Sequence, residues 1–130
     1  MKIEKTFEEA FAEVEKITDR LGEPVDDKIK NLVAALLMFG IRTTMSCEGH
    51  RDRAAYPWVD VDPADAIRLN RMVAIQNRPT LDDGGENSNL WVVLPAGEYL
   101  WLVPWNVDRP LEELQRGAEA FAERLRQFAD

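Results

Sequence analysis

Two short apolar runs in the second half of the chain most constrain its fold. Residues 90–94 and 99–103 are apolar at both odd and even positions, so an extended run would be apolar on both faces. A strand of this kind usually lies in the interior of a sheet whose two faces are both covered by other elements. The residues between the runs, Pro95-Ala96-Gly97-Glu98, are typical of a tight turn. The sequence therefore predicts a β-hairpin inside a covered sheet.

The first predicted helix opens with a capping box. Thr6 and Glu9 stand three residues apart, so each side chain can bind the other residue's free backbone N–H. Apolar residues at helical spacing continue to Leu21, and Gly22 and Pro24 then end the helix.

A second helix is predicted from Asp26 or Asp27, either of which is a good N-cap, to Phe39. Its apolar face is wide enough for the helix to be nearly buried. Gly40 follows, where a left-handed residue is needed to end the helix.

Two more helices are expected later in the chain. One begins at Asp62 and Pro63 and ends before Pro79. Its expected buried residues are Ile67, Met72, Val73 and Ile75. The last begins near Pro110 and carries an apolar stripe at heptad spacing, formed by Leu111, Leu114, Ala118, Phe121, Leu125 and Phe128. This stripe favours packing against the sheet, and a dimer seam is the alternative.

Two further strands are predicted from their β-branched and alternating residues. One covers residues 41–47, and the other covers 56–61, with Val59 and Val61 on one face and Trp58 and Asp60 on the other. The predicted class is α+β: two N-terminal helices precede two β-β-α units, which form a four-stranded, mainly antiparallel sheet covered by helices. We expect the 130 residues to form a single domain, 1–130.

Composition and charge limit the partners and the cellular compartment that we expect for the protein. The net charge of −8 disfavours nucleic acid as a partner, because nucleic-acid binders concentrate basic charge. One cysteine allows no intrachain disulfide. The first residues lack the apolar segment of a signal peptide, and the strongly apolar run 32–40 is about half the length of a membrane span. We therefore expect a cytoplasmic protein without a membrane partner.

One segment concentrates the reactive side chains. Cys47 and His50, the only cysteine and histidine of the chain, stand three residues apart where a predicted strand runs into a loop, and Gly49 allows a tight turn between them. Reactive groups are commonly carried on loops that rigid elements hold in place.

Three kinds of chemistry fit this segment. Cys47 can act as a nucleophile with His50 as its base. Cys47 and His50 can instead bind a transition metal, with a further ligand from Glu48, Asp52 or Asp60. Alternatively, the segment can bind an anion through its local arginines, Arg42, Arg51 and Arg53, and through the backbone N–H groups near Ser46 to Gly49.

A structural role is the further alternative. Cys47 would then be a small buried residue, His50 would satisfy a turn, and the arginines would pair with Asp52, Asp60 or surface glutamates. The tryptophans fit either a core or a pocket; they are Trp58, Trp91, Trp101 and Trp105.

The run from Gly40 to His50, followed by Tyr56-Pro57-Trp58-Val59, resembles a family of small, functionally uncharacterised bacterial and phage proteins. These carry a Thr-x-x-Ser-Cys-Glu-Gly-His signature before a short aromatic strand. More distantly, residues 44–49 are similar to the Ser-Cys-Ser-Gly-Arg signature of the wybutosine-synthesis methyltransferases, which modify transfer RNA with S-adenosylmethionine. That resemblance implies that Ser46, Cys47 and Gly49 lie in a functional pocket, with Glu48 and His50 replacing that family's Ser and Arg.

The leading hypothesis is a ligand-binding or catalytic pocket around residues 46–53 that takes a small anionic molecule or a divalent metal. Cys47 and His50 are its candidate catalytic or ligating residues. The candidate ligand-binding residues are Ser46, Glu48, Gly49, Arg51, Arg53, Trp58 and Asp60. No cofactor signature accompanies them, and enzymatic activity stays open. The alternative is a non-enzymatic protein–protein interaction module that forms a homodimer or larger homo-oligomer.

Overall fold

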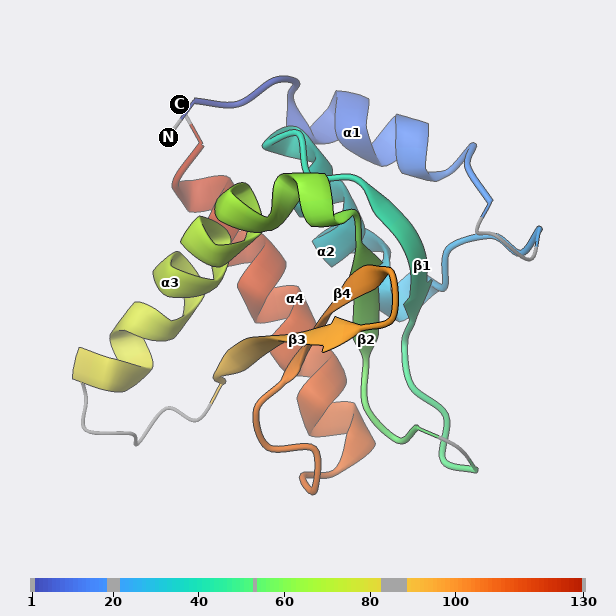
Figure 1. The fold of residues 1–130 in the computed structure, drawn as a ribbon, viewed down its shortest axis with the longest axis vertical. Coiled ribbons are helices and arrows are strands. Elements are labelled where there is room, and N and C mark those ends of the chain that lie inside the picture. Colours follow the sequence, from blue (N-terminus) through green and yellow to red (C-terminus); the bar gives the residue numbers. More distant parts are fainter. Residues whose placement is uncertain (1, 19–21, 53, 83–88, 130) are drawn as a thin grey trace.

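The computed structural model describes residues 2–18, 22–52, 54–82 and 89–129 (Figure 1). The helices are α1 Phe7–Val14, α2 Asp27–Met38, α3 Ala66–Asp82 and α4 Leu111–Gln127, and a short 3-10 turn, Pro63–Asp65, leads into α3. The strands are β1 Thr43–Cys47, β2 Trp58–Val61, β3 Trp91–Ala96 and β4 Tyr99–Pro104. The predicted α+β class and the order of its elements are confirmed.

The sheet has the strand order β1-β2-β4-β3, and every neighbouring pair is antiparallel. In the predicted hairpin, Ala96 pairs with Tyr99 around the turn. β4 lies inside the sheet, as expected for a strand that is apolar on both faces. β3 is an edge strand, and Leu94 is 46% exposed. β2 takes the place beside β4 through the pairing of Val59 with Leu102, which leaves β3 at the edge.

The two faces of the sheet differ. Val59, Val61 and Leu102 are fully buried on the face against which the helices pack. In Figure 1, α2 and α4 lie behind the strands. Trp58 and Trp101 point to the opposite face and stay partly exposed. The prediction that helices cover the sheet therefore holds for one face, while the other carries tryptophans and a hollow surface.

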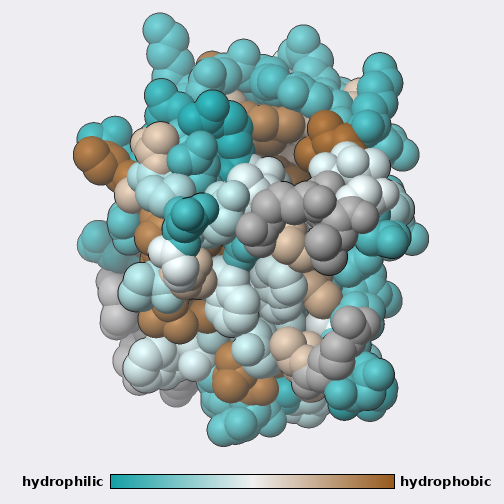
Figure 2. Space-filling model, turned by 45° about the vertical axis from the view of Figure 1, so that its right-hand side comes forward, coloured by the Kyte–Doolittle hydropathy of each residue, from teal (hydrophilic) through white to brown (hydrophobic). Residues whose placement is uncertain are grey.

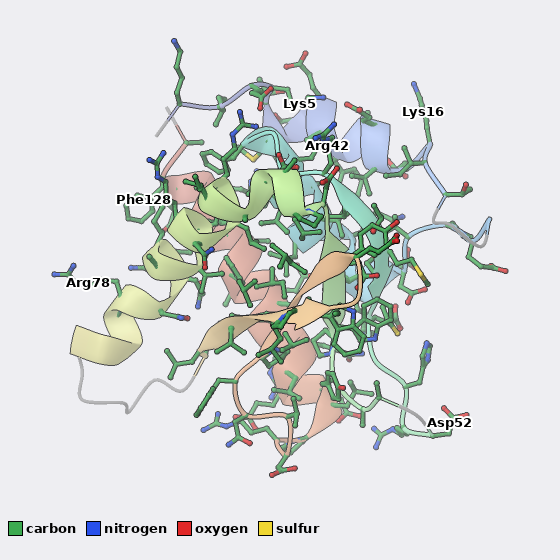
Figure 3. The ribbon with its side chains drawn as sticks, viewed as in Figure 1. Lys5, Lys16, Arg42, Asp52, Arg78 and Phe128 are labelled. Carbon is green, nitrogen blue, oxygen red and sulfur yellow. The ribbon has the colours of Figure 1, made fainter. Side chains whose placement is uncertain are left out.

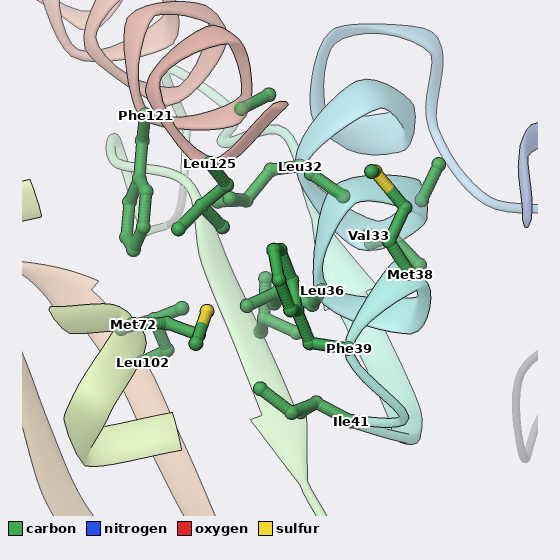
Figure 4. Packing of buried hydrophobic residues seen from close by; sticks show 14 of the residues in the cluster. Leu32, Val33, Leu36, Met38, Phe39, Ile41, Met72, Leu102, Phe121 and Leu125 are labelled. Atoms are coloured by element: carbon green, nitrogen blue, oxygen red, sulfur yellow. The ribbon is translucent and has the colours of Figure 1, made fainter. Parts of the chain in front are cut away.

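The core forms where α2 and α4 meet the covered face. Most of α2 is buried, as its wide apolar face predicts: Ile29, Leu32, Val33, Ala34, Ala35, Leu36 and Met38. Figure 4 shows Leu32 of α2 beside Leu125 of α4, with Leu102 of the sheet below Phe121. Gly40 follows α2 with a φ of 78°, the left-handed conformation expected there.

α1 is shorter than predicted. It ends at Val14, and Ile17 is 37% exposed. Thr18 forms an isolated antiparallel bridge with Pro24, so the chain turns back where the apolar spacing predicted more helix. Ile17 and Thr18 are β-branched, which makes them weak helix formers. Leu21, the last apolar position of the prediction, lies outside the described residues.

α3 continues through Pro79, where the sequence predicted its end. Proline has no N–H, so the carbonyl of Ile75, four residues earlier, loses its helical partner. Arg124 of α4 replaces that partner, since its Nε donates to the Ile75 carbonyl at 3.1 Å. The buried face also differs from the prediction: Ile67 is 73% exposed, and Leu69 is fully buried in its place.

The apolar stripe of α4 packs within one protomer. Its buried members are Leu114, Ala118, Phe121 and Leu125. Phe121 meets the ring of Trp91 on β3 edge to face, with 5.3 Å between centroids. α4 lies chiefly against α2 and α3, and through Phe121 it also reaches the sheet. At the end of the stripe, Phe128 is 43% exposed. No helix of the described ranges is long and apolar enough to cross a membrane.

Thr6→Ala is expected to lower the free energy of unfolding by about 1 kcal/mol, because it removes the hydroxyl that accepts the Glu9 N–H. The backbone N–H and the side chain of Thr6, with a smaller contribution from Lys5, also lower the pKa of Glu9. A lowered folded-state pKa stabilises the fold once Glu9 is ionised. This contribution to stability is lost as the pH falls through the folded-state pKa of Glu9. The cost of Thr6→Ala should therefore shrink in acid.

Urea unfolding at neutral and acidic pH measures both effects. Thr6→Ser keeps the hydroxyl and serves as the control. An equal loss of stability in Thr6→Ser would contradict the capping role.

Candidate functional site

The turn that follows β1 is held by contacts from three directions. The His50 N–H donates to the Ala54 carbonyl at 3.0 Å and closes the loop on itself. Gln115 of α4 donates from Nε2 to the Glu48 carbonyl at 3.0 Å. Gly49 is buried with a φ of 94°, and a Cβ atom there would lie 2.6 Å from Leu111 Cδ1. The predicted need for glycine in this turn therefore has both a conformational and a packing cause.

The turn and the N-terminus of α2 exchange hydrogen bonds. Asp26 is the N-cap of α2, but its side chain does not cap its own helix. Asp26 Oδ2 instead accepts from the Glu48 N–H at 3.1 Å, and Glu48 Oε1 accepts from the Lys28 N–H at 3.2 Å. Glu48, a predicted ligand-binding residue, thus holds a helix terminus, where a carboxylate is electrostatically favoured.

Three possible metal-ligating atoms converge beside this exchange. A carboxylate oxygen of Asp26, the sulfur of Cys47 and a ring nitrogen of His50 all lie within 4.8 Å of one another. All three residues are partly buried. The structure therefore brings together the predicted Cys47 and His50 and adds Asp26, which the sequence had indicated only as a helix cap.

Backbone N–H groups face the two acidic members of this cluster. The Gly49 N–H lies 3.3 Å from Cys47 Sγ, and the Glu48 N–H is bound to Asp26. These contacts hold the sulfur and the carboxylate oxygen in place beside each other. Deprotonated sulfur and oxygen are the forms of these groups that bind a metal ion.

The cluster opens into a pocket of about 600 Å³. Ser46 and Trp58, both predicted site residues, line it together with Glu23 and Trp101. The rings of Trp58 and Trp101 are stacked, with centroids 5.4 Å apart and an interplanar angle of 19°. The pocket therefore has an acidic and metal-ligating end and an aromatic wall.

The remaining predicted residues lie elsewhere. Arg51 forms an ion pair with Glu112 and is 75% exposed. Asp60 is buried and faces a neighbouring hollow of the open sheet face, and Arg53 lies outside the described residues. Of the possible further metal ligands, Asp52 projects outward from its loop (Figure 3).

Arg42 does not join the other arginines. It lies at the far end of β1, where it pairs with Asp62 at 3.6 Å and Asp65 at 3.5 Å. Figure 3 shows Arg42 and Asp52 at opposite ends of the β1–β2 pair. The two described arginines of the predicted anion site, Arg42 and Arg51, are thus apart, and each is paired with carboxylates.

The surface around β1 is mixed in character. Figure 2 shows this side of the molecule with a hydrophilic rim, a paler middle and hydrophobic atoms in separate patches.

Gly49→Ala is expected to destabilise the fold by about 2 kcal/mol or more, because it adds both left-handed strain and steric overlap at the turn. Gly97→Ala is the matched control, since Gly97 also has a positive φ, 63°, but nothing lies within 4 Å of its added Cβ. Thermal unfolding of both variants compares the two sites. An equal loss at the two positions would show that the packing of Gly49 contributes nothing.

Comparison with known proteins identifies no relative of this chain. No protein-family model matches the chain, and no curated protein or solved structure matches it significantly. The resemblances of the segment around Cys47 and His50 therefore stay predictions.

Proposed function

We propose that the protein binds a divalent transition-metal ion of the zinc type through Asp26, Cys47 and His50. The convergence of their three ligand atoms within 4.8 Å is the observation that carries the proposal. These atoms come from the start of α2, the end of β1 and the following turn, so folding is what brings them together.

The donor set fits zinc better than calcium or magnesium. Thiolate and imidazole suit zinc and similar transition metals, whereas calcium and magnesium prefer oxygen. A tetrahedral ion with bonds of about 2.0–2.3 Å holds its ligand atoms roughly 3.3–3.8 Å apart. The three side chains therefore need to move inward by only about 1 Å to reach that geometry.

Charge favours a cation over the anionic ligand that was the other hypothesis. Glu23 and Asp26 line the pocket, and no lysine or arginine does so among the residues that the structure describes. Arg51 is engaged with Glu112 on α4. A metal ion would neutralise the acidic end of the pocket, whereas a phosphate or carboxylate would add negative charge to it.

The cluster supplies three protein ligands and faces an open pocket. Structural zinc sites usually have four protein ligands, whereas catalytic ones keep a position for water or substrate. The arrangement thus supports a site that presents a metal ion to a small molecule beside Trp58 and Trp101. Hydrolytic chemistry by a metal-bound water is the reaction type that such a site serves.

Titration of metal-free protein with Co²⁺ and Zn²⁺ tests the proposal. Wild type should show a thiolate-to-cobalt absorption band that Zn²⁺ removes. Cys47→Ser should abolish the band, and Asp26→Asn and His50→Ala should each weaken binding by at least about tenfold, since even outer-shell changes cost that much. Zinc at about 100 times its dissociation constant should stabilise the wild type by roughly 2.7 kcal/mol.

Asp27→Asn is the matched control, because Asp27 adjoins Asp26 but is 93% exposed and pairs with Lys30. It should bind metal like the wild type. A folded wild type that shows neither the cobalt band nor stabilisation by zinc would rule out the site.

A nucleophilic Cys47 with His50 as its base is the second candidate, because the same proximity supports it. Alkylation by iodoacetamide separates the two, since Cys47 is the only cysteine. Metal binding predicts that Zn²⁺ slows alkylation several-fold in wild type and has less effect in Asp26→Asn. If Zn²⁺ leaves the rate of alkylation unchanged but His50→Ala lowers it, the result would favour the role of Cys47 as a nucleophile.

A further inference from the structure

The open face of the sheet carries a second hollow of about 580 Å³. Its walls are Met45 of β1, Trp58 and Asp60 of β2, Trp101 of β4 and the hairpin turn from Ala96 to Tyr99. It adjoins the pocket of the metal cluster, because Met45, Trp58 and Trp101 line both. The proposed metal site does not use this part of the surface.

Strand register explains why these side chains share one face. Asp60 pairs with Met45 on one side and with Trp101 on the other, so the three form a row across the sheet. Trp58 and Tyr99 stand two residues from Asp60 and Trp101 along their strands and therefore point the same way. The register thus places three aromatic side chains and one carboxylate on the same face of the sheet.

The hollow is acidic as well as aromatic. Asp60 is only 4% exposed and lies on the lining, and Glu98 stands at the hairpin turn. None of the lining residues within the described ranges is a lysine or arginine. The faces of tryptophan and tyrosine rings are electron-rich and attract cations, most strongly where water is excluded.

We propose that this hollow binds an organic cation, specifically an alkylated ammonium group, on the Trp58–Trp101 pair. The alkyl groups would contact the indole rings and the Met45 side chain. The positive charge would face the ring surfaces and the carboxylates of Asp60 and Glu98. An alkylated ammonium fits better than a bare metal ion, since the lining offers few ligand atoms. It also fits better than a neutral apolar molecule, since only a cation complements the negative charge of the lining.

Choline and 3,3-dimethyl-1-butanol test this inference because they have nearly the same shape and differ in charge. Binding is measured by calorimetry on the full chain with EDTA present, so that the result does not depend on the metal site. Choline should bind at least about tenfold more tightly than the neutral alcohol, as expected for a cation on a partly desolvated aromatic site. Equal binding of the two, or no binding of choline, would overturn the proposal.

Variants locate the site. Trp101→Phe should weaken choline binding several-fold and Trp101→Leu should weaken it further, because the attraction falls with the aromatic surface. Asp60→Asn should weaken choline but not the alcohol. The controls are Trp105→Leu, at a residue that is 66% exposed outside the hollow, and Asp108→Asn, which removes one exposed negative charge elsewhere.

Circular dichroism confirms that each variant is folded. If Asp60→Asn does not fold, the ligand pair and the Trp101 series decide alone. Choline binding that is unchanged in both Trp101 variants, or that falls equally in Trp105→Leu, would refute the assignment. A folded wild type that binds choline but neither Co²⁺ nor Zn²⁺ would overturn the metal proposal and leave this one standing.

Discussion

Two hydrogen bonds between the start of α2 and the turn after β1 hold the arrangement on which the proposed metal site depends. Asp26 accepts the Glu48 N–H, and Glu48 accepts the Lys28 N–H. Hydrogen bonds to a carboxylate are stronger than those between neutral groups, and a helix N-terminus adds to them. They tie a helix terminus to a strand end, and Gln115 anchors the same turn to α4. The positions of Asp26, Cys47 and His50 relative to one another follow from this connection.

The one-sided packing of the sheet is the second constraint. Helices bury one face, and its apolar residues supply the core. The other face keeps large side chains that are neither buried nor fully solvated. The four tryptophans show the difference: Trp91 is buried against Phe121, Trp58 and Trp101 stack on the open face, and Trp105 is 66% exposed. An aromatic surface beside a cluster of metal-ligating atoms results from this asymmetry.

Predictions from the sequence succeeded where the deciding interactions are local. The capping box of Thr6 and Glu9, the end of α2 near Gly40 and the alternation of Val59 and Val61 each depend on residues within one turn or one strand. One clear failure was decided by a distant residue. α3 passes Pro79 because Arg124 of another helix binds the carbonyl that proline leaves without a donor.

The sequence by itself determined the α+β class, the order of the elements and the placement of Cys47 and His50 at the end of a strand, because hydrophobic periodicity and turn residues encode these features locally. Only the tertiary structure decided that Asp26 is their neighbour, that Arg42 is not, and that β3 lies at an edge. The physical reason is the same in each case. Contacts between residues far apart in the chain depend on how helices and strands pack, and packing is set by the whole core.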